Sequence, residues 1–257
     1  VDLLEGASDP DNNPLSVANV TTTGDVSGIV FTDNKATVHP SAYNSLAVSE
    51  QEVITISYDV IDGQGGSVAQ TATITITGLN DPTTAITGDT TGAVTEDSIL
   101  AATGTLAVTD PDNGDDEVIA QSDSAGTYGL FSVDATGNWT YTLTNASGLV
   151  QALGQNDTPT DTFSVTSKDG GATVDVIVTI NGVNDAPTTG APITETFTED
   201  QAVTPVNLLE GASDAESDTL SVADYTVTSG NAVGVVQNAN TVDVTPTAYA
   251  SLEDGAF

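Results

Sequence analysis

Residues 51–62 read QEVITISYDVID, and this stretch decides the fold class. The apolar residues Ile54, Ile56 and Tyr58 alternate with polar ones, which is the period of a strand that buries one face. The same alternation returns in six later runs, at residues 72–76, 106–108, 131–133, 139–143, 163–165 and 174–180. None of these runs has the spacing of an amphipathic helix. The sequence therefore predicts an all-β protein.

Turn-forming residues separate these runs. They include Asp62-Gly63, Asn113-Gly114, Gly137-Asn138 and Asp169-Gly170-Gly171. Such short segments are typical of tight connections between antiparallel strands. We therefore expect antiparallel hairpins packed as β-sandwiches.

The chain contains an internal repeat. Residues 1–9 read VDLLEGASD and residues 206–214 read VNLLEGASD. After a one-residue shift the correspondence continues, with Pro40, Tyr43, Ser45 and Leu46 matching Pro246, Tyr249, Ser251 and Leu252. The segment GLNDP at residues 78–82 likewise returns as GVNDAP at residues 182–187. The repeat length of about 100 residues is that of one β-sandwich module.

This register divides the chain into three modules, at residues 1–81, 82–187 and 188–257. The first module begins after the position at which the others carry Thr-Glu-Asp, so it lacks its first strand. The last module ends before the counterpart of residues 53–76. Because an incomplete sheet exposes unpaired strand edges, we expect head-to-tail self-association through the two end modules.

The composition limits the classes of partner. The chain has 2 Lys and Arg residues against 37 Asp and Glu residues, a formal net charge of -35. Such a chain is repelled by nucleic acid and by anionic bilayers, and no run approaches the roughly 20 apolar residues of a spanning helix. We therefore expect no nucleic-acid partner and no membrane insertion. The chain has no cysteine, so disulfides cannot stabilise it, and its self-repulsion calls for bound cations.

The acidic residues gather at turns and at the links between modules. Each module has an acidic pair spaced by two residues, and an aspartate precedes glycine late in the first two modules. With the Asn-Asp pairs of the links, the candidate ligands are Asp9, Asp11, Asp62, Asn80, Asp81, Asp110, Asp112, Asp169, Asn184, Asp185, Asp214 and Glu216. Calcium takes about six to eight oxygens from carboxylates, carbonyls and Asn side chains. The sequence therefore predicts calcium sites between modules.

Solvated turns are the alternative interpretation of these acids. An isolated loop aspartate is better explained by turn geometry, whereas recurrence at one position of three modules favours a metal ligand. The sequence contains neither an EF-hand loop nor the glycine-rich nonapeptide calcium repeat. The predicted site is therefore interdomain.

The middle module carries a set of motifs that resembles the VCBS-type repeat of giant bacterial surface proteins. The motifs are GTL at residues 104–106, GTYG at 126–129, GNWTYTL at 137–143, DTF at 161–163, DG at 169–170 and NDAP at 184–187. The flanking modules resemble cadherin-like repeats, because they carry the acidic pair, an Asp-Gly turn and the Asn-Asp-Pro link. The fold class implied is a tandem, extended array of Ig-like, cadherin-like antiparallel β-sandwich modules.

The resemblance also implies a function. It implies an RTX-type adhesin, exported by a type I system to the outer-membrane surface of a Gram-negative bacterium, that serves biofilm formation or host attachment. By the cadherin-like pattern one calcium group is Asn80, Asp81, Glu96, Asp110 and Asp112, and the next is Asn184, Asp185, Glu199, Asp214 and Glu216. This chain is then a spacer that projects distal binding domains, with calcium ions and neighbouring modules as its partners.

Three features suggest other functions. His39 is the only histidine, but a Ser-His-Asp triad also needs an orienting acid and an oxyanion hole. Asp110 and Asp112 could serve glycoside hydrolysis, yet active-site pairs would not recur in every module. Trp139 and Tyr141 could form a platform for sugars, but they share one face of a strand and are better explained as core. We predict that the chain is not an enzyme, and keep a module that binds glycan, peptide or protein as the alternative function.

Overall fold

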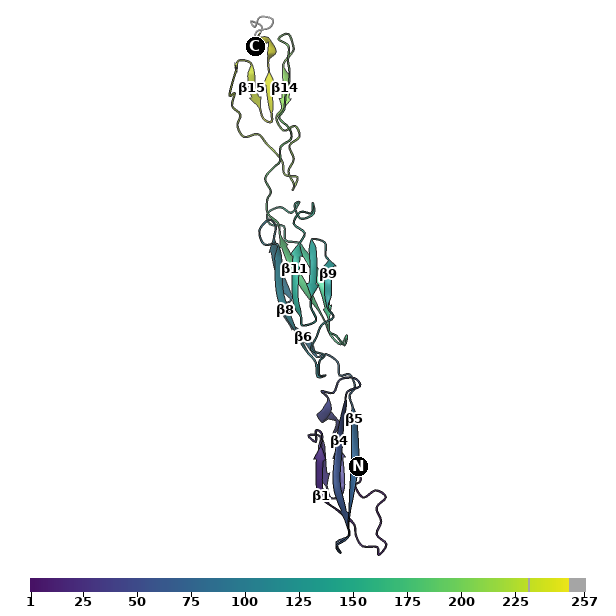
Figure 1. The fold of residues 1–257 in the computed structure, drawn as a ribbon. Helices are drawn as coiled ribbons and strands as arrows, with labels where there is room; N and C mark the ends of the chain where they lie inside the picture. The colour runs from purple at the N-terminus through teal and green to yellow at the C-terminus, as the bar shows by residue number, and fades with distance from the viewer. Residues whose placement is uncertain (231, 250–257) are drawn as a thin grey trace.

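The computed structural model describes residues 1–230 and 232–249. Its strands gather in three bodies that follow one another along an elongated particle (Figure 1). We call these bodies, in chain order, the first, middle and last modules. The described residues contain no α-helix, only the 3-10 helices η1 (Pro40–Tyr43) and η2 (Pro246–Tyr249). None of the helices in this part of the chain is long and apolar enough to cross a membrane. The fold is all-β, as predicted.

The first module has two small antiparallel sheets. Its strands are β1 (Ser16–Thr23), β2 (Ile29–Thr32), β3 (Lys35–Val38), β4 (Gln51–Ile61) and β5 (Ser67–Thr77). One sheet has the order β1-β4-β5, and β2 pairs with β3 in the other. The alternation predicted for β4 is confirmed, because Ile54 and Ile56 are fully buried and Tyr58 is nearly so.

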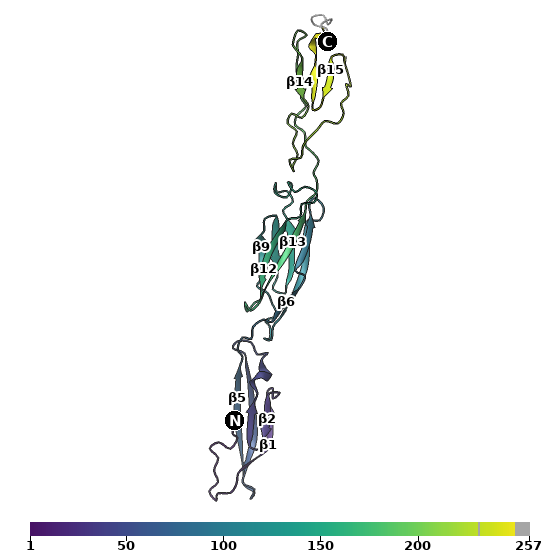
Figure 2. The same cartoon turned by 180° about the vertical axis from the view of Figure 1, so that it is seen from behind.

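The middle module is a two-layer sandwich. Its strands are β6 (Ala85–Gly88), β7 (Thr91–Thr95), β8 (Ala101–Thr109), β9 (Gln121–Ala125), β10 (Gly129–Val133), β11 (Asn138–Leu143), β12 (Thr160–Thr166) and β13 (Thr173–Asn181). The larger sheet has the order β6-β8-β11-β10-β9, and the smaller has the order β12-β13-β7. Strands β12 and β13 of the smaller sheet are seen best from behind, in Figure 2.

Aromatic side chains fill the space between these layers. Trp139 and Tyr141 of β11 are buried with Phe131 and Phe163, and the rings of Phe131 and Phe163 stack with centroids 4.6 Å apart. The Trp139 indole Nε1 donates a hydrogen bond to the carbonyl oxygen of Asp89 at 2.7 Å. Trp139 and Tyr141 are therefore core residues, as the alternation in β11 predicts, and not an exposed platform for sugars.

One pairing departs from the antiparallel pattern. Strand β7 runs parallel to β13, with Val94 opposite Ile180. The chain passes from the larger to the smaller sheet just after Gly88, which has a φ of 116° and where a Cβ would collide with the carbonyl oxygen of Thr105. Glu96 follows β7 directly, and its amide donates to the carbonyl oxygen at the end of β13. The sheet switch therefore places Glu96 at the end of the middle module that faces the last module.

The last module repeats part of the first. Its strands are β14 (Thr204–Asn207), β15 (Val235–Asn238) and β16 (Thr241–Val244), in the order β14-β16-β15. The Asn240 side chain accepts the amide of Val222 at 3.0 Å, as the Asn34 side chain accepts the amide of Val17 at 2.9 Å in the first module. The sequence repeat is therefore also a structural repeat.

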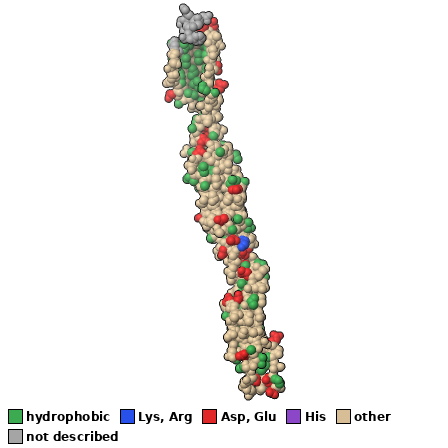
Figure 3. Space-filling view, viewed as in Figure 1, with side chains coloured by type: hydrophobic (Ala, Val, Ile, Leu, Met, Phe, Trp, Pro, Cys, Tyr) green, Lys and Arg blue, Asp and Glu red, His purple; other side chains and the backbone are tan. Residues whose placement is uncertain are grey.

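The last module is packed more openly than the other two. Among its described residues Val242 and Pro246 are the two apolar side chains that are buried, whereas Val203 and Val236 are more than half exposed. Figure 3 shows hydrophobic side chains gathered on this module, and acidic side chains along the whole particle. The repeat positions Ser251 and Leu252 belong to residues 250–257, which lie outside the described part of the chain.

Candidate metal sites at the module junctions

Most of the predicted ligands lie at the two links between modules. We define the first junction as Asn80, Asp81, Thr83, Asp110, Asp112 and Asp169. We define the second junction as Glu96, Asp97, Gln151, Asn184, Asp185, Asp214 and Glu216. Asp9, Asp11 and Asp62 lie apart from both, around the β4–β5 turn of the first module.

Each link is tied to the following module by one hydrogen bond. The amide of Asp81 donates to Oδ2 of Asp112 at 2.8 Å, and the amide of Asp185 donates to Oε1 of Glu216 at 2.7 Å. The second acid of each pair therefore binds the link. The two junctions share this geometry although the two acids differ in length.

The first acid of each pair shapes its turn. Oδ1 of Asp9, Asp110 and Asp214 accepts the backbone amide two residues later, at 2.8, 2.8 and 3.2 Å. This is the turn that aspartate side chains form with their own backbone. Turn geometry thus accounts for the first acid of each pair, but not for Asp112 and Glu216, which bind the links.

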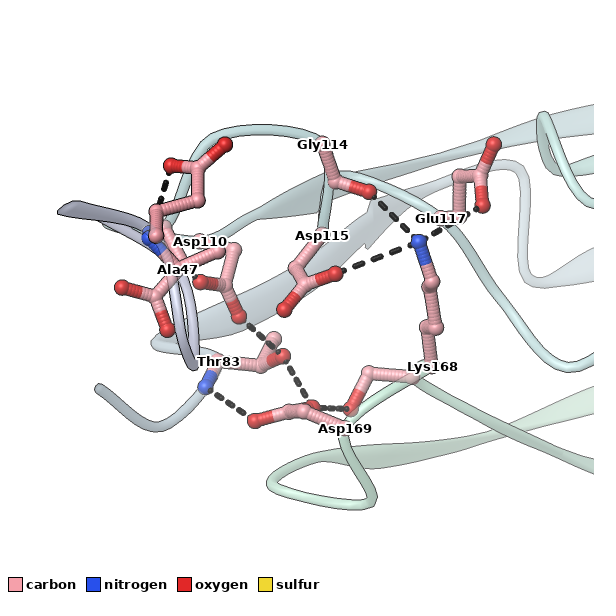
Figure 4. Close-up of polar contacts among 11 residues, drawn as sticks. Ala47, Thr83, Asp110, Gly114, Asp115, Glu117, Lys168 and Asp169 are labelled. Carbon is pink, nitrogen blue, oxygen red and sulfur yellow. Dashed lines mark hydrogen bonds and ion pairs between the residues drawn. The ribbon is translucent and has the colours of Figure 1, made fainter. Parts of the chain in front are cut away.

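The first junction is dense in hydrogen bonds (Figure 4). The Thr83 hydroxyl lies 2.7 Å from Oδ2 of Asp110 and 2.6 Å from Oδ1 of Asp169, and the Thr83 amide donates to Asp169 at 2.9 Å. The Ser167 hydroxyl and the Gly171 amide also donate to Asp169. These donors, Ser167 first among them, hold the pKa of Asp169 well below its ordinary value. Asp169 is therefore already well compensated as a carboxylate.

A lysine lies beside the first junction. Nζ of Lys168 is 3.2 Å from Asp115 and 3.3 Å from Glu117, and it donates to the carbonyl oxygen of Gly114 at 2.7 Å (Figure 4). The contact with Asp115, followed by that with Glu117, raises the pKa of Lys168. The chain has only 2 Lys and Arg residues. One of its two basic side chains therefore neutralises acids next to the first junction.

One carboxylate of the first junction remains incompletely bonded. Asp112 is 2% exposed, and its Oδ1 is buried without a hydrogen-bond partner. A charged oxygen that has lost its water without gaining a donor destabilises the fold. A cation bound to Oδ1 of Asp112 would compensate its buried negative charge.

The prediction that Glu96 joins Asp110 and Asp112 was wrong. Glu96 is fully buried at the other end of the middle module, where its Oε2 accepts the amide of Val183 at 3.1 Å. Glu96 belongs to the second junction because β6 and β7 follow one another along the length of the module, and Glu96 comes directly after β7. Glu199 has the same place in the repeat, so it belongs to the far end of the last module, and its side chain is exposed.

Five carboxyl groups converge at the second junction, from Glu96, Asp97, Asp185, Asp214 and Glu216. Burial raises the pKa of Glu96, and the charges of Asp185, Asp97 and Glu216 raise it further. Burial also raises the pKa of Asp185, with further contributions from Asp97, Glu216 and Asp214. Oε2 of Glu216 is buried without a partner. The negative charge of this junction is therefore poorly compensated.

The other predicted ligands are more peripheral. Asp9 and Asp62 line one hollow of about 320 Å³, and Asp11 is exposed. Backbone amides of the β4–β5 turn lower the pKa of Asp62. Asn80 and Asn184 are exposed, and the Asn184 amide donates to the carbonyl oxygen of the next residue at 2.7 Å.

The chemistry of the junctions fits calcium, although no site is closed. Within residues 1–230 and 232–249, no three His, Cys, Asp or Glu side chains are arranged to hold a metal ion as they lie. The available donors are nonetheless all oxygens on loops, which is the ligand set of calcium. Each junction also has one buried carboxylate oxygen without a partner, on Asp112 and on Glu216.

Sequence reasoning missed three participants. Asp97 lies in the recurring Thr-Glu-Asp motif, so its signal was visible, but only the glutamate of the motif was selected. Thr83 is 86 residues from Asp169, and only the fold brings them together. Gln151 lies in the loop between β11 and β12, and its Nε2 donates to Oε1 of Glu96 at 2.9 Å. No motif pointed to this contact.

The sandwich topology and the acidic junctions define a tandem array of cadherin-like modules. Residues 1–77 and 183–252 match the family model of the cadherin-like domain, and residues 80–182 match that of the bacterial cadherin-like domain. The chain therefore belongs to the cadherin-like domain family. A comparison with curated protein sequences found no match.

Three solved structures are among those to which the chain is similar. The human desmocollin-1 ectodomain is 15% identical, with a TM-score of 0.43, over 92% of this chain and 48% of that one. Mouse clustered PcdhgC3 EC1-3 is 12% identical, with a TM-score of 0.41, over 95% of this chain and 83% of that one. Domains 4 and 5 of the S-layer protein SbsC are 21% identical, with a TM-score of 0.26, over 50% of this chain and 65% of that one. The chain thus spans about half the length of the desmocollin-1 structure.

Proposed function

We propose that this chain is a calcium-stabilised spacer of a secreted bacterial adhesin, which projects distal binding domains for cell adhesion and biofilm formation. Tandem cadherin-like domains in an elongated particle support the spacer function. The observation that carries the calcium part is the convergence of five carboxyl groups from two modules and their link at the second junction.

Electrostatics explains why this cluster suits a divalent cation. Two carboxylates about 4 Å apart repel by roughly 4 kcal/mol at an effective dielectric constant of about 20. Bound calcium would supply positive charge that reverses this repulsion. Glu96 and Asp97 contribute oxygens from the middle module, Asp185 from the link, and Asp214 and Glu216 from the last module. Ligands from both sides would restrain one module relative to the next.

We extend the calcium proposal to the other predicted ligands. At the first junction we propose Asn80, Asp81, Asp110, Asp112 and Asp169 as ligands, supported by the unpaired buried oxygen of Asp112. The remaining proposed ligands are Asn184 at the second junction, Asp9, Asp11 and Asp62 at the start of the first module, and Glu199 at the end of the last. Each of these needs a neighbouring module or an ion to complete its site.

Several finer features belong to this proposal. Module boundaries at residues 81 and 187 follow the repeat, and the motifs of the middle module support a VCBS-type variant of the bacterial cadherin-like domain. Cadherin-like domains are extracellular, which supports a location on the bacterial surface, with type I secretion and an RTX-type adhesin as the expected context. We further propose that the chain has no enzymatic activity and that its end modules associate head to tail.

The spacer proposal is tested by melting and small-angle scattering in EDTA, in millimolar calcium and in millimolar magnesium. Calcium should raise the melting temperature and lengthen and stiffen the particle more than magnesium does, because an ion bound only by the native state stabilises it. Glu96→Gln should reduce the response, whereas Glu117→Gln, on the surface of the same module, should not. A wild-type chain with no calcium response would show that these acids are only solvated turns.

The alternative function, a module that binds glycan, peptide or protein, has less support. A hollow of about 380 Å³ on the β1-β4-β5 sheet is lined mainly by polar residues such as Asn19 and Gln70. Its one aromatic residue, Tyr58, is only 7% exposed. No stacking surface for a sugar is available in this hollow, so the spacer function is favoured.

A further inference from the structure

Gln151 places a side-chain amide among the acids of the second junction. Its Nε2 donates to Oε1 of Glu96 at 2.9 Å and to the carbonyl oxygen of Asn145 at 3.1 Å, and lies 3.5 Å from Oδ1 of Asp97. The partner Glu96 is 55 residues away in the chain. One amide group therefore contacts two of the five converging carboxyl groups.

The loop that carries Gln151 is fixed to the same acids. The Asn145 side chain accepts the amide of Asp97 at 3.0 Å and donates to its Oδ1 at 2.6 Å. Val150, next to Gln151, is fully buried in the core of the middle module. The amide is therefore positioned by packing on one side and by the junction on the other.

The first module has an amide at the same position. In both modules a short turn lies against the glycine that begins the link, Gly78 or Gly182, and the backbone hydrogen bonds of the two turns coincide: Leu46 to Tyr43 and Leu153 to Val150. Asn44 is thus the counterpart of Gln151. Asn44 and Asp81 line one hollow of about 290 Å³, and Gln151 and Asp185 line another of about 370 Å³. An amide and the linker aspartate share a hollow at both junctions.

A carboxamide can serve an anion and a cation in turn. Its NH2 end donates to carboxylates, and its oxygen accepts, being a ligand type that calcium uses. Turning the terminal torsion of Gln151 by about half a turn exchanges the two ends, because this torsion is roughly two-fold. The backbone need not move.

We propose that Gln151 is an ion-responsive clamp of the second junction. Its NH2 group holds Glu96 and Asp97 when no ion is bound, and its Oε1 becomes a ligand when calcium is bound. This inference rests on the proposed calcium function and adds a ligand from a loop of the middle module. The orientation of the Gln151 side chain, in the β11–β12 loop, thereby depends on whether calcium is bound at the second junction.

Two substitutions of Gln151 separate the two ends of the amide. Gln151→Leu removes both, so it should weaken calcium binding at the second junction about tenfold and lower the melting temperature in EDTA. Gln151→Glu adds an anionic ligand, so it should strengthen calcium binding while lowering the melting temperature in EDTA further. The matched control is Gln155, an exposed residue of the same loop, whose Leu and Glu variants should behave as wild type.

A local signal distinguishes a ligand from a merely structural residue. The side-chain ¹⁵N–¹H₂ resonance of Gln151, identified by its loss in Gln151→Leu, should shift when calcium is added, whereas that of Gln155 should not. If the wild type responds to calcium but the resonance is unmoved and Gln151→Leu binds as tightly, the clamp is wrong and the spacer function survives. If the wild type gains no stability from calcium, the spacer function itself is wrong and the clamp falls with it.

Discussion

The two junctions have the same linker hydrogen bond but compensate their acids differently. At the first junction Asp169 accepts several donors and has a lowered pKa, and Lys168 lies beside it. At the second junction the pKa values of Glu96 and Asp185 are raised. One junction is held by hydrogen bonds of the protein, whereas the other retains uncompensated negative charge.

One part of this difference traces to a single position. Thr84 and Thr188 are equivalent, because each donates its amide and hydroxyl to the carbonyl oxygen just before the neighbouring acidic pair, at 2.8 to 3.1 Å. The preceding residue is Thr83 at the first junction and Pro187 at the second. Proline has neither an amide hydrogen nor a hydroxyl, so the second junction lacks both donors that Thr83 supplies. Similar acidic motifs can therefore differ in their need for a cation.

The largest expected effect is at Asp169. Asp169→Ala removes a carboxylate that accepts bonds from Ser167, Thr83 and Gly171 and leaves buried donors unpaired, so it should lower the free energy of unfolding of the middle module by about 2–4 kcal/mol. The loss should appear in EDTA as well as in calcium. Denaturant melts measure it, with the exposed Asp175→Ala as control. A loss confined to calcium buffer would mean that the first junction also depends on the ion.

The next largest effect is expected for Glu96→Gln, which should stabilise the protein without calcium and weaken calcium binding. Glu96→Gln removes a buried negative charge from a repulsive cluster, so it should raise the melting temperature in EDTA. In calcium it should weaken binding at the second junction by about 2 kcal/mol, roughly 30-fold, because a charged ligand is lost. Calorimetric titration measures the calcium affinity, and thermal melting measures the melting temperature in EDTA. Lower stability in EDTA would contradict the claim that this junction is strained by its own charge.

Lowering the pH in EDTA should change the stability contributed by the two junctions in opposite directions. The pKa values of Glu96 and Asp185 are raised, so the folded state binds protons more tightly and gains stability as the pH falls toward their ordinary values of 4.5 and 3.8. The pKa of Asp169 is lowered, so its contribution is complete above its ordinary value of 3.8 and is lost below it. Melting curves from pH 7 to pH 3 should therefore rise and then fall. Glu96→Gln should diminish the rise, and Asp169→Asn should diminish the fall.

The smallest expected effect is at Lys168. Its side chain is 49% exposed, so the stability cost of Lys168→Met should be small, and smaller still at high salt. The matched variant Lys35→Met, in the first module, should leave the first junction unchanged. A cost several times larger would show that Lys168, and not the hydrogen bonds of Thr83, compensates this junction.

The sequence predicted the strands and the repeat well, because alternation and recurrence are local signals. The alternation of Trp139 and Tyr141 identified core residues correctly, and the Asn-Asp links marked the junctions. The ligand grouping failed for Glu96, because the sheet switch after Gly88 sends the first strand to the opposite end of its module. A one-dimensional register cannot reveal which end of a sandwich a strand reaches.

The participants that were missed share a physical reason. Thr83 and Gln151 matter through hydrogen bonds to residues 86 and 55 positions away, and such pairs leave no spacing pattern. The chemical difference between Thr83 and Pro187 is visible in the sequence, but its meaning depends on knowing that Asp169 faces that position. The residue types at these positions can be read from the sequence, whereas their hydrogen-bond partners cannot.

We propose that a cation acts chiefly at the second junction, and distances between modules test this proposal most directly. The chain has no cysteine, so spin labels can be placed uniquely at the exposed positions Thr75, Thr162 and Val236, one in each module, as pairs of cysteine substitutions. Moving from EDTA to calcium should narrow the Thr162–Val236 distance distribution strongly and the Thr75–Thr162 distribution weakly. An unchanged Thr162–Val236 distribution, or a larger change across the first junction, would contradict this account.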